Sequence, residues 1–112
     1  TGTVSYPLSV GVNLPANRKI CIVVHANVQG TTANVGFSLG VANAAGTIIN
    51  QAFAFLPVAG VGQMITCPVF TTTGGGGSTT YQMSVFSAGG NGTLVAAATN
   101  HAYIAVIDQG AV

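Results

Sequence analysis

The feature that most constrains this chain is an alternation of apolar with small or polar residues, which recurs along nearly its whole length. Successive side chains of a β-strand point to opposite faces of a sheet, so a period of two predicts strands with one face packed on a core. The clearest segment has an apolar face made of Ile20, Ile22, Val24, Ala26 and Val28. Its opposite face would carry Cys21, Val23, His25 and Asn27.

Turn-forming residues separate these alternating segments from one another. We expect about eight short strands, within residues 4–12, 20–28, 35–41, 48–56, 64–70, 81–86, 93–98 and 103–107. Pro7 and Pro68 lie inside two of them, and a proline without an N–H group favours an edge strand or a bulge. The Asn91-Gly92 pair predicts a hairpin turn before the seventh strand. Short strands at this spacing are typical of a β-sandwich or barrel, so we expect an all-β, antiparallel β-sandwich.

The segment TTTGGGGSTT, residues 71–80, contains four consecutive glycines. A linker would have to separate two units that each build a core, but residues 79–112 supply only about three strands, which are marginal alone. A phosphate-binding loop would be followed by a helix and usually contains lysine, whereas residues 81–86 have the pattern of a strand. We therefore expect residues 71–80 to form a flexible loop with an exposed tip, inside a single domain that spans residues 1–112.

Only three residues carry a formal charge, which is 3% of the chain against about 25% in typical soluble domains. A net charge of +1 favours neither nucleic acid nor an anionic membrane as a partner. No apolar run approaches the ~18 residues of a spanning helix, so no membrane insertion is expected. Interface cores are depleted in charge, and we therefore expect copies of the chain or a larger assembly to cover much of this surface. The start at Thr1 indicates a processed or trimmed chain.

The residue types that enzymes use are scarce. Paired-carboxylate catalysis needs two acids, and Asp108 is the only acidic residue. A serine in a Gly-x-Ser-x-Gly context does not occur. The chain is therefore predicted not to be an enzyme, with no catalytic site, cofactor site or metal site. Arg18 and Lys19 are interpreted as a solvated turn, with a salt bridge to Asp108 of the same or another subunit as the alternative.

The cysteines and histidines each allow more than one interpretation. Cys21 and Cys67 match no metal-binding spacing, and two buried thiols are favoured over a disulfide or a metal or reactive site. His25 and His101 are interpreted as hydrogen-bonded residues at the edge of the core. Under threefold symmetry, one histidine per subunit near the axis would instead suffice for a metal site or a pH switch.

The last third of the chain resembles a known group of domains. Residues 81–87, the glycine-rich turn at residues 89–93 and the final segment, residues 101–108, resemble trimeric jelly-roll domains. Such domains occur in tumour-necrosis-factor-like and complement-head-like proteins and in phage fibre tips and head decorations. The resemblance implies a jelly-roll type of sandwich whose last strand lies near a threefold axis. The acidic residues that bind calcium in this family have no counterpart here.

The resemblance leads to a functional hypothesis: a non-enzymatic structural protein of a virion or similar extracellular assembly. It would be a homotrimeric capsid decoration or fibre-head subunit. The expected trimer interface consists of Tyr81, Met83, Tyr103, Ala105 and Ile107. A possible ligand loop, which could reach a cell-surface glycan, consists of Gln82, Asn91 and His101.

Two other functions are kept as alternatives. The chain could be a carbohydrate-binding, lectin-like domain of the same fold. It could also be a filament subunit in which residues 4–12 complete the sheet of a neighbour by β-strand addition.

Overall fold

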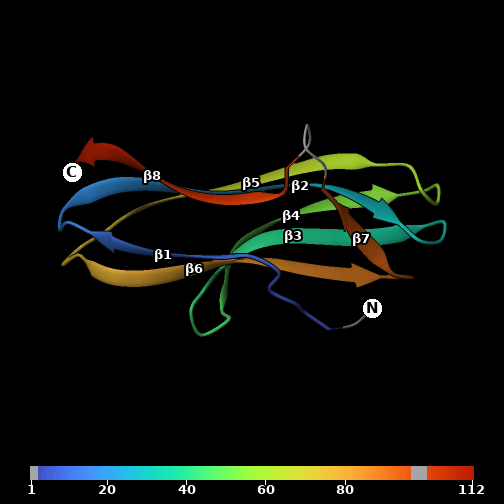
Figure 1. Cartoon of the computed structure of the whole chain (residues 1–112), viewed down its shortest axis with the longest axis horizontal. Helices are drawn as coiled ribbons and strands as arrows, with labels where there is room; N and C mark the ends of the chain where they lie inside the picture. Colours follow the sequence, from blue (N-terminus) through green and yellow to red (C-terminus); the bar gives the residue numbers. More distant parts are fainter. Residues whose placement is uncertain (1–2, 97–100) are drawn as a thin grey trace.

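Residues 3–96 and 101–112 are described by the computed structural model, and none of them is helical. They form eight strands: β1 (Ser9–Leu14), β2 (Arg18–Gly30), β3 (Val35–Asn43), β4 (Ile48–Leu56), β5 (Gln63–Thr72), β6 (Gly77–Ala88), β7 (Gly92–Val95) and β8 (Tyr103–Ala111). The expected all-β fold with eight strands is confirmed. Figure 1 shows most strands running along the long axis of one flat body, with β7 oblique to them; the body measures 46 × 29 × 18 Å.

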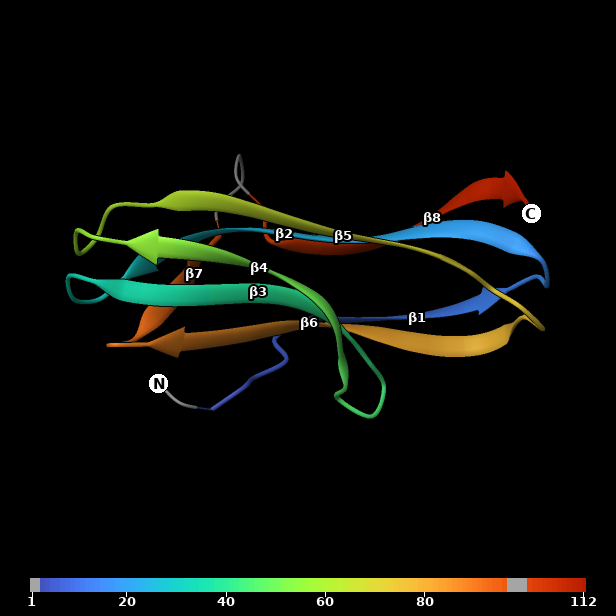
Figure 2. The ribbon, with the colours of Figure 1, turned by 180° about the vertical axis from the view of Figure 1, so that it is seen from behind.

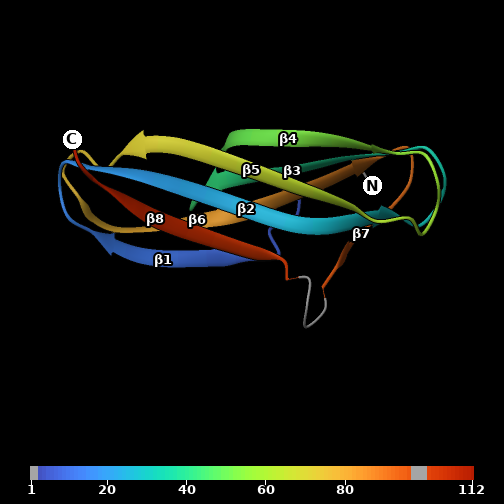
Figure 3. The ribbon, with the colours of Figure 1, turned by 90° about the horizontal axis from the view of Figure 1, so that it is seen from above.

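The strands form two antiparallel sheets that pack face to face, which confirms the β-sandwich (Figures 1 and 2). One sheet, called here the β3 sheet, has the order β1-β6-β3-β4. The other, called the β2 sheet, has β5 on one side of β2. On the other side of β2, β8 pairs with its first part and β7 with its last residues. Figure 3 shows β8 and β7 following each other along this side of β2.

The sandwich is jelly-roll-like in its winding. A strict eight-stranded jelly roll pairs its strands from the outside of the sequence inward, so that strand two meets strand seven and strand three meets strand six. Both of these pairings are present, as β2–β7 and β3–β6. The other strands pair differently. β1 lies beside β6 and β8 beside β2, and β4 and β5, which the same rule would pair, lie in different sheets beside β3 and β2.

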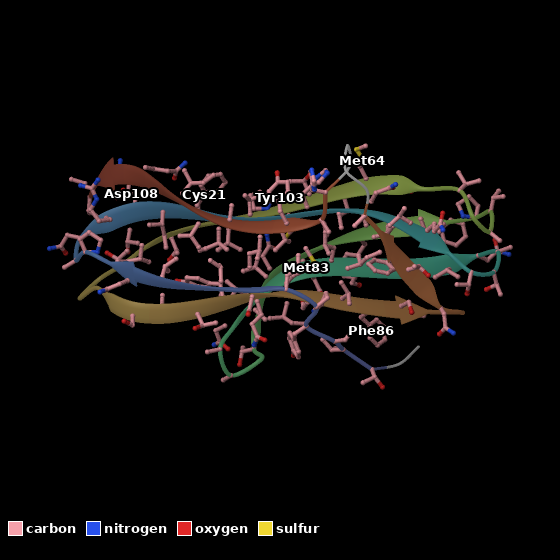
Figure 4. The ribbon with its side chains drawn as sticks, viewed as in Figure 1. Cys21, Met64, Met83, Phe86, Tyr103 and Asp108 are labelled. Carbon is pink, nitrogen blue, oxygen red and sulfur yellow. The ribbon has the colours of Figure 1, made fainter. Side chains whose placement is uncertain are left out.

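The core lies between the sheets and is made by the alternating residues of the sequence. The apolar face predicted for β2 is fully buried, at 0% exposure for each of Ile20, Ile22, Val24, Ala26 and Val28. The β3 sheet packs against this face with Val35, Phe37, Leu39, Val41, Ala54, Leu56 and Met83. Figure 4 shows Met83 between the two sheets. Burial of these side chains is the main stabilising term, at about 25 cal/mol per Å² of apolar surface.

The two prolines inside predicted strands, Pro7 and Pro68, lie where the absence of an N–H group is tolerated. Pro68 is on β5, an edge strand of the β2 sheet, as expected. Pro7 separates β1 from an isolated bridge, in which Ser5 and Val85 exchange backbone hydrogen bonds of 3.0 and 2.9 Å. The predicted strand at residues 4–12 is therefore interrupted, and the regular ladder begins only at Ser9.

The loop predicted for residues 71–80 is shorter than expected. β5 continues to Thr72 and β6 begins at Gly77, so only residues 73–76 connect them. The prediction failed because β1 supplies pairing partners, with Leu14 opposite Gly77. The turn is also tied to its neighbour: the Thr73 hydroxyl donates to the Pro15 carbonyl at 2.7 Å, and the Asn17 N–H donates to the Gly74 carbonyl at 3.0 Å.

The Asn91-Gly92 pair does not form the predicted hairpin. β6 and β7 belong to different sheets, so the chain crosses from one sheet to the other at this point. The left-handed residues are Gly89 and Gly90, with φ of 77° and 149°. Gly92 is needed for space, because a Cβ atom there would overlap the ring of Phe37. The glycines therefore serve a crossover between layers, which local sequence cannot distinguish from a hairpin. The partner strand expected at residues 93–98 is β7, and residues 97–98 lie outside the described residues.

Replacing Gly92 with alanine should lower the free energy of unfolding by about 1–3 kcal/mol, because the added methyl group must displace Phe37 from the core. Gly75→Ala is the matched control, since nothing lies within 4 Å of a Cβ atom there. Urea unfolding followed by fluorescence or circular dichroism measures both variants. Equal unfolding midpoints for the two variants would contradict the close packing of Gly92 on Phe37.

Candidate functional site

The outer face of the β2 sheet is apolar although it faces solvent. Its large exposed side chains are Met64 (63% exposed), Phe70 (70%), Tyr103 (42%) and Ile107 (48%). In the strand register, Cys21 lies between Phe70 and Ile107, and the next layer places Val23 between Pro68 and Ala105. Figure 4 shows Met64 and Tyr103 on this outer side. We call this surface the β2 face.

A histidine is fixed in the middle of the β2 face. His25 lies between Thr66 and Tyr103 in the register. Its Nδ1 is 2.7 Å from the Thr66 hydroxyl oxygen, at hydrogen-bond distance. Its ring stacks on that of Tyr103, with centroids 5.3 Å apart and planes inclined by 25°. This geometry confirms a hydrogen-bonded His25, although the residue lies on the outer face of the sheet and not at the edge of the core. Both rings lie in one layer of that face.

An ion pair fastens one end of β8 to β2. Arg18 Nε donates to both carboxylate oxygens of Asp108, at 3.1 and 3.0 Å, and a terminal guanidinium nitrogen lies 3.0 Å from Oδ1. The Gly110 N–H donates to the same carboxylate at 2.9 Å. The Gly110 hydrogen bond and the Arg18 side chain together lower the pKa of Asp108 from its ordinary value. The alternative of a salt bridge within one subunit is therefore the one that the structure bears out.

Replacing Asp108 with asparagine should weaken the loss of folding stability that accompanies a fall in pH. A lowered folded-state pKa means that the carboxylate contributes stability above the ordinary aspartate pKa and loses it as the pH falls through the folded-state value. Thermal unfolding of both proteins from neutral to strongly acidic pH measures this. Asp108 is the single acidic side chain, so an equally steep decline in the variant would contradict its role.

The outer face of the β3 sheet carries a second apolar surface. Ala54 and Leu56 face the core, so Phe53 and Phe55 of β4 face outward, at 73% and 60% exposure. With Phe86 of β6 they border an open groove of about 310 Å³ whose floor is formed by small residues of β3. Figure 4 shows Phe86 on this outer side. The groove is lined almost entirely by apolar groups, which suits packing rather than ionic recognition.

A hollow on the β1 side of the β3 sheet has a different character. It measures about 580 Å³ and lies over β1 and β6, beside the β3–β4 turn. Its lining consists of Gly11, Val12, Asn13, Ala44, Ser78, Thr79 and Thr80. None of these side chains titrates near neutral pH, so the hollow offers hydroxyl and amide groups but no acid–base pair.

The five residues predicted for a trimer interface do not share one face. Met83 is 0% exposed in the core, and Tyr81 packs partly buried against the same core. Both face inward because β6 turns its residues 81, 83 and 85 toward the sandwich interior. Assigning Met83 to a subunit interface was therefore wrong. Tyr103, Ala105 and Ile107 do lie together, on the β8 part of the β2 face.

The three residues predicted for a ligand loop are also spread over the molecule. Gln82 donates from Nε2 to the Asn43 carbonyl at 3.0 Å, at one end of β3. Asn91 lies near the other end of β3, where its carbonyl accepts from the Thr31 N–H at 2.9 Å. His101 is exposed ahead of β8. Gln82 and Asn91 thus hold turns in place at opposite ends of the sandwich, and the expectation of one common loop was wrong.

The two cysteines are buried thiols, as favoured from the sequence. They point to opposite sides of the β2 sheet, because Cys67 faces the core opposite Val24 whereas Cys21 faces outward opposite Phe70. Burial raises the pKa of the Cys67 thiol. Within residues 3–96 and 101–112, no three His, Cys, Asp or Glu side chains come together to hold a metal ion. A histidine site shared between copies stays a prediction.

Neither thiol should react with a small aromatic disulfide reagent in the folded protein, because both side chains are buried and burial also raises the pKa of Cys67. Both should react after unfolding. Phe70→Ala should accelerate the labelling of Cys21 on the β2 face and leave Cys67 protected. Mass spectrometry of peptides after timed labelling distinguishes the two sites. Rapid native labelling of Cys67 would contradict its place in the core.

The apolar character of the outer face of the β3 sheet was not predicted from the sequence. The alternation in β4 was visible, with Phe53 and Phe55 flanked by alanines. Period-two patterning separates two faces but does not say which one is the core, and the larger side chains are usually assigned inward. Here the alanines face inward. Gly36 and Ser38 of β3 form the floor of the groove between the phenylalanines.

Comparison with known proteins identifies no family. No protein-family model matches the chain, and no curated protein shows significant sequence similarity to it. In the described part of the chain no helix is long and apolar enough to cross a membrane. The fold and its two apolar faces therefore carry the functional argument.

Proposed function

We propose that this chain is a non-enzymatic structural subunit that works by packing against copies of itself and attaching to a larger surface. The proposed assembly is a homotrimer on a virion or similar extracellular structure, in the role of a capsid decoration or fibre head. The β2 face is the proposed contact between subunits. This contact keeps three residues of the predicted interface, Tyr103, Ala105 and Ile107. It adds Cys21, Val23 and Phe70.

The observation that carries this proposal is the exposure of the β2 face. Monomeric proteins rarely expose a large continuous apolar surface, and such surfaces mark interaction sites. Met64, Phe70, Tyr103 and Ile107 surround a centre that combines small apolar side chains with the hydrogen-bonded pair His25 and Thr66, on three paired strands. A flat apolar sheet face is well suited to pack against another sheet about 10 Å away.

Two further observations support association with copies rather than with a charged partner. Only 3% of the residues are charged, and a single chain with so few charges is expected to associate. A homo-oligomer closes most simply around a symmetry axis. The threefold axis and the virion setting rest on the resemblance of the last third of the chain to trimeric jelly-roll domains.

The non-enzymatic part of the proposal rests on the chemistry of the side chains. The single carboxylate, Asp108, is engaged by Arg18 and the Gly110 N–H at the end of the β2 sheet. Those partners hold it as a charged structural group, which is unsuited to accept a proton at neutral pH. No second acid exists in the sequence to pair with it.

Native mass measurement at micromolar concentration should give a trimer or a multiple of three subunits, each of 11.1 kDa. Ile107→Lys places a charge in the β2 face and should abolish the threefold association. Ser9→Lys adds the same charge at an exposed position on β1 and should leave it intact. Circular dichroism verifies that both variants fold. A stable wild-type monomer, or a trimer that survives Ile107→Lys, would refute the proposed role of this face.

The two alternatives have less support from the fold. The residues predicted to reach a glycan lie at separate places, so a lectin would need a different site. In the filament alternative residues 4–12 join a neighbour, but Ser5 and residues 9–12 already pair with β6 of their own chain. Deleting residues 1–12 separates the cases, because a filament would fall apart whereas a trimer should keep its stoichiometry.

A further inference from the structure

The free edges of the two sheets differ in how well they are protected. An edge strand exposes unpaired N–H and C=O groups, and proteins usually block it with proline, charge, a bulge or a short length. The strand order leaves β1 and β4 at the edges of the β3 sheet, and β5 at one edge of the β2 sheet. β8 and β7 share the remaining edge.

Three of these edges carry a protecting feature. β1 has only six residues and lies between Pro7 and Pro15. β5 contains Pro68 near its middle. β8 contains Asp108, and its register with β2 shifts next to Lys19. β7 has only four residues. Each of these strands is therefore a poor template for another strand.

β4 is the exception. It has nine residues, IINQAFAFL, with no proline and no charged side chain. Its one irregularity in the pairing with β3 lies at its start, beside Ile48, so residues 50–56 form a regular ladder. In the part of the chain that the structure describes, β3 is its only partner in the sheet, and the Asn50 amide donates to the Pro68 carbonyl of β5 at 3.0 Å, toward the other sheet. An edge that is long, regular and apolar is expected to pair with another strand.

We propose that the free edge of β4 pairs antiparallel with β4 of a second copy of this chain about a twofold axis, which joins two β3 sheets into one continuous sheet. This contact is distinct from the β2 face and goes beyond the proposed trimer. It would provide a second type of interface in the same assembly.

The partner must match an edge without charge and with aromatic rings on one side. All three charged side chains lie on β2 and β8, in the other sheet, so ionic contacts do not define this edge. A second β4 offers the same neutrality and alternation, and the register described below brings residues 52–56 of both copies opposite each other. Antiparallel strands about a twofold axis place odd residues opposite odd residues, so outer faces meet outer faces and core faces meet core faces.

A particular register follows from the phenylalanines. If the axis passes beside Ala54, Phe53 of each copy lies opposite Phe55 of the other, on the outer face. Directly opposed aromatic pairs stabilise antiparallel strands more than pairs of small residues do. In the free chain the two rings are 73% and 60% exposed, and this register covers both of them. The register also keeps Ala54 and Leu56 directed into the core.

The first experiment measures native mass for edge and face variants. Phe53→Lys places a charge on the β4 edge and should remove the twofold contact, so that assemblies larger than a trimer fall to a trimer. Phe86→Lys is the matched control, because Phe86 borders the same groove but lies on the inner strand β6; it should leave the mass unchanged. An unchanged mass for Phe53→Lys, or an equal loss for Phe86→Lys, would overturn the edge contact.

The same series separates this inference from the proposed function. Ile107→Lys should leave a dimer if the β4 edge pairs as proposed, whether or not the β2 face forms a trimer. A monomer in that variant would overturn the edge contact. A trimer in that variant would instead overturn the role of the β2 face.

A cross-linking experiment tests the register independently of stability. Phe53→Cys, labelled uniformly with a heavy nitrogen isotope, is mixed with unlabelled Phe55→Cys under mild oxidation. Disulfides between the two variants should exceed those within either one several-fold, and Phe86→Cys mixed with either should give none. The native cysteines are buried and should not compete. Equal yields of disulfides between and within the variants would overturn the proposed register. The absence of any disulfide, at a protein concentration at which the wild type assembles, would overturn the contact itself.

Discussion

The structure depends on β2. This strand has thirteen residues, and it pairs with β5 along one side and with β8 and β7 along the other. Its inward side chains are fully buried against the β3 sheet. One strand thus holds together its own sheet and supplies a large part of the core. Its outward side chains, from Cys21 to Asn27, then necessarily form the centre of the β2 face.

Much of the fold could be predicted from sequence because burial and alternation coincide. The side chains of β2 and β3 that face the core are the apolar half of the pattern, and Pro68 correctly indicated an edge. Connections were harder to predict. Gly89 to Gly92 serve a crossing between sheets rather than a hairpin, and the pairing of Gly77 with Leu14 shortens an expected loop. Both depend on partners distant in sequence, which local turn rules do not include.

The surfaces were less predictable than the core. Choosing which side of a strand faces inward requires knowledge of the opposing sheet. Met83 was assigned outward but lies in the core, and the sequence made no prediction for Phe53, which lies outside beside inward-facing alanines. Tyr103 and Ile107 were placed together correctly because they share one side of one strand. Residues from different elements, such as Gln82 of β6 and Asn91 of the β6–β7 connection, could be grouped only after the topology was known.

The ion pair between Arg18 and Asp108 has a consequence for how the molecule meets its neighbours. It neutralises two of the three charged side chains at short range, which leaves Lys19 as the remaining formal side-chain charge. A body with so weak an electric field gains little from long-range attraction, and collisions between such bodies are governed by shape and diffusion. Added salt should therefore hardly slow the approach of two molecules, and an assembly of this kind would tolerate surroundings whose ionic strength varies widely.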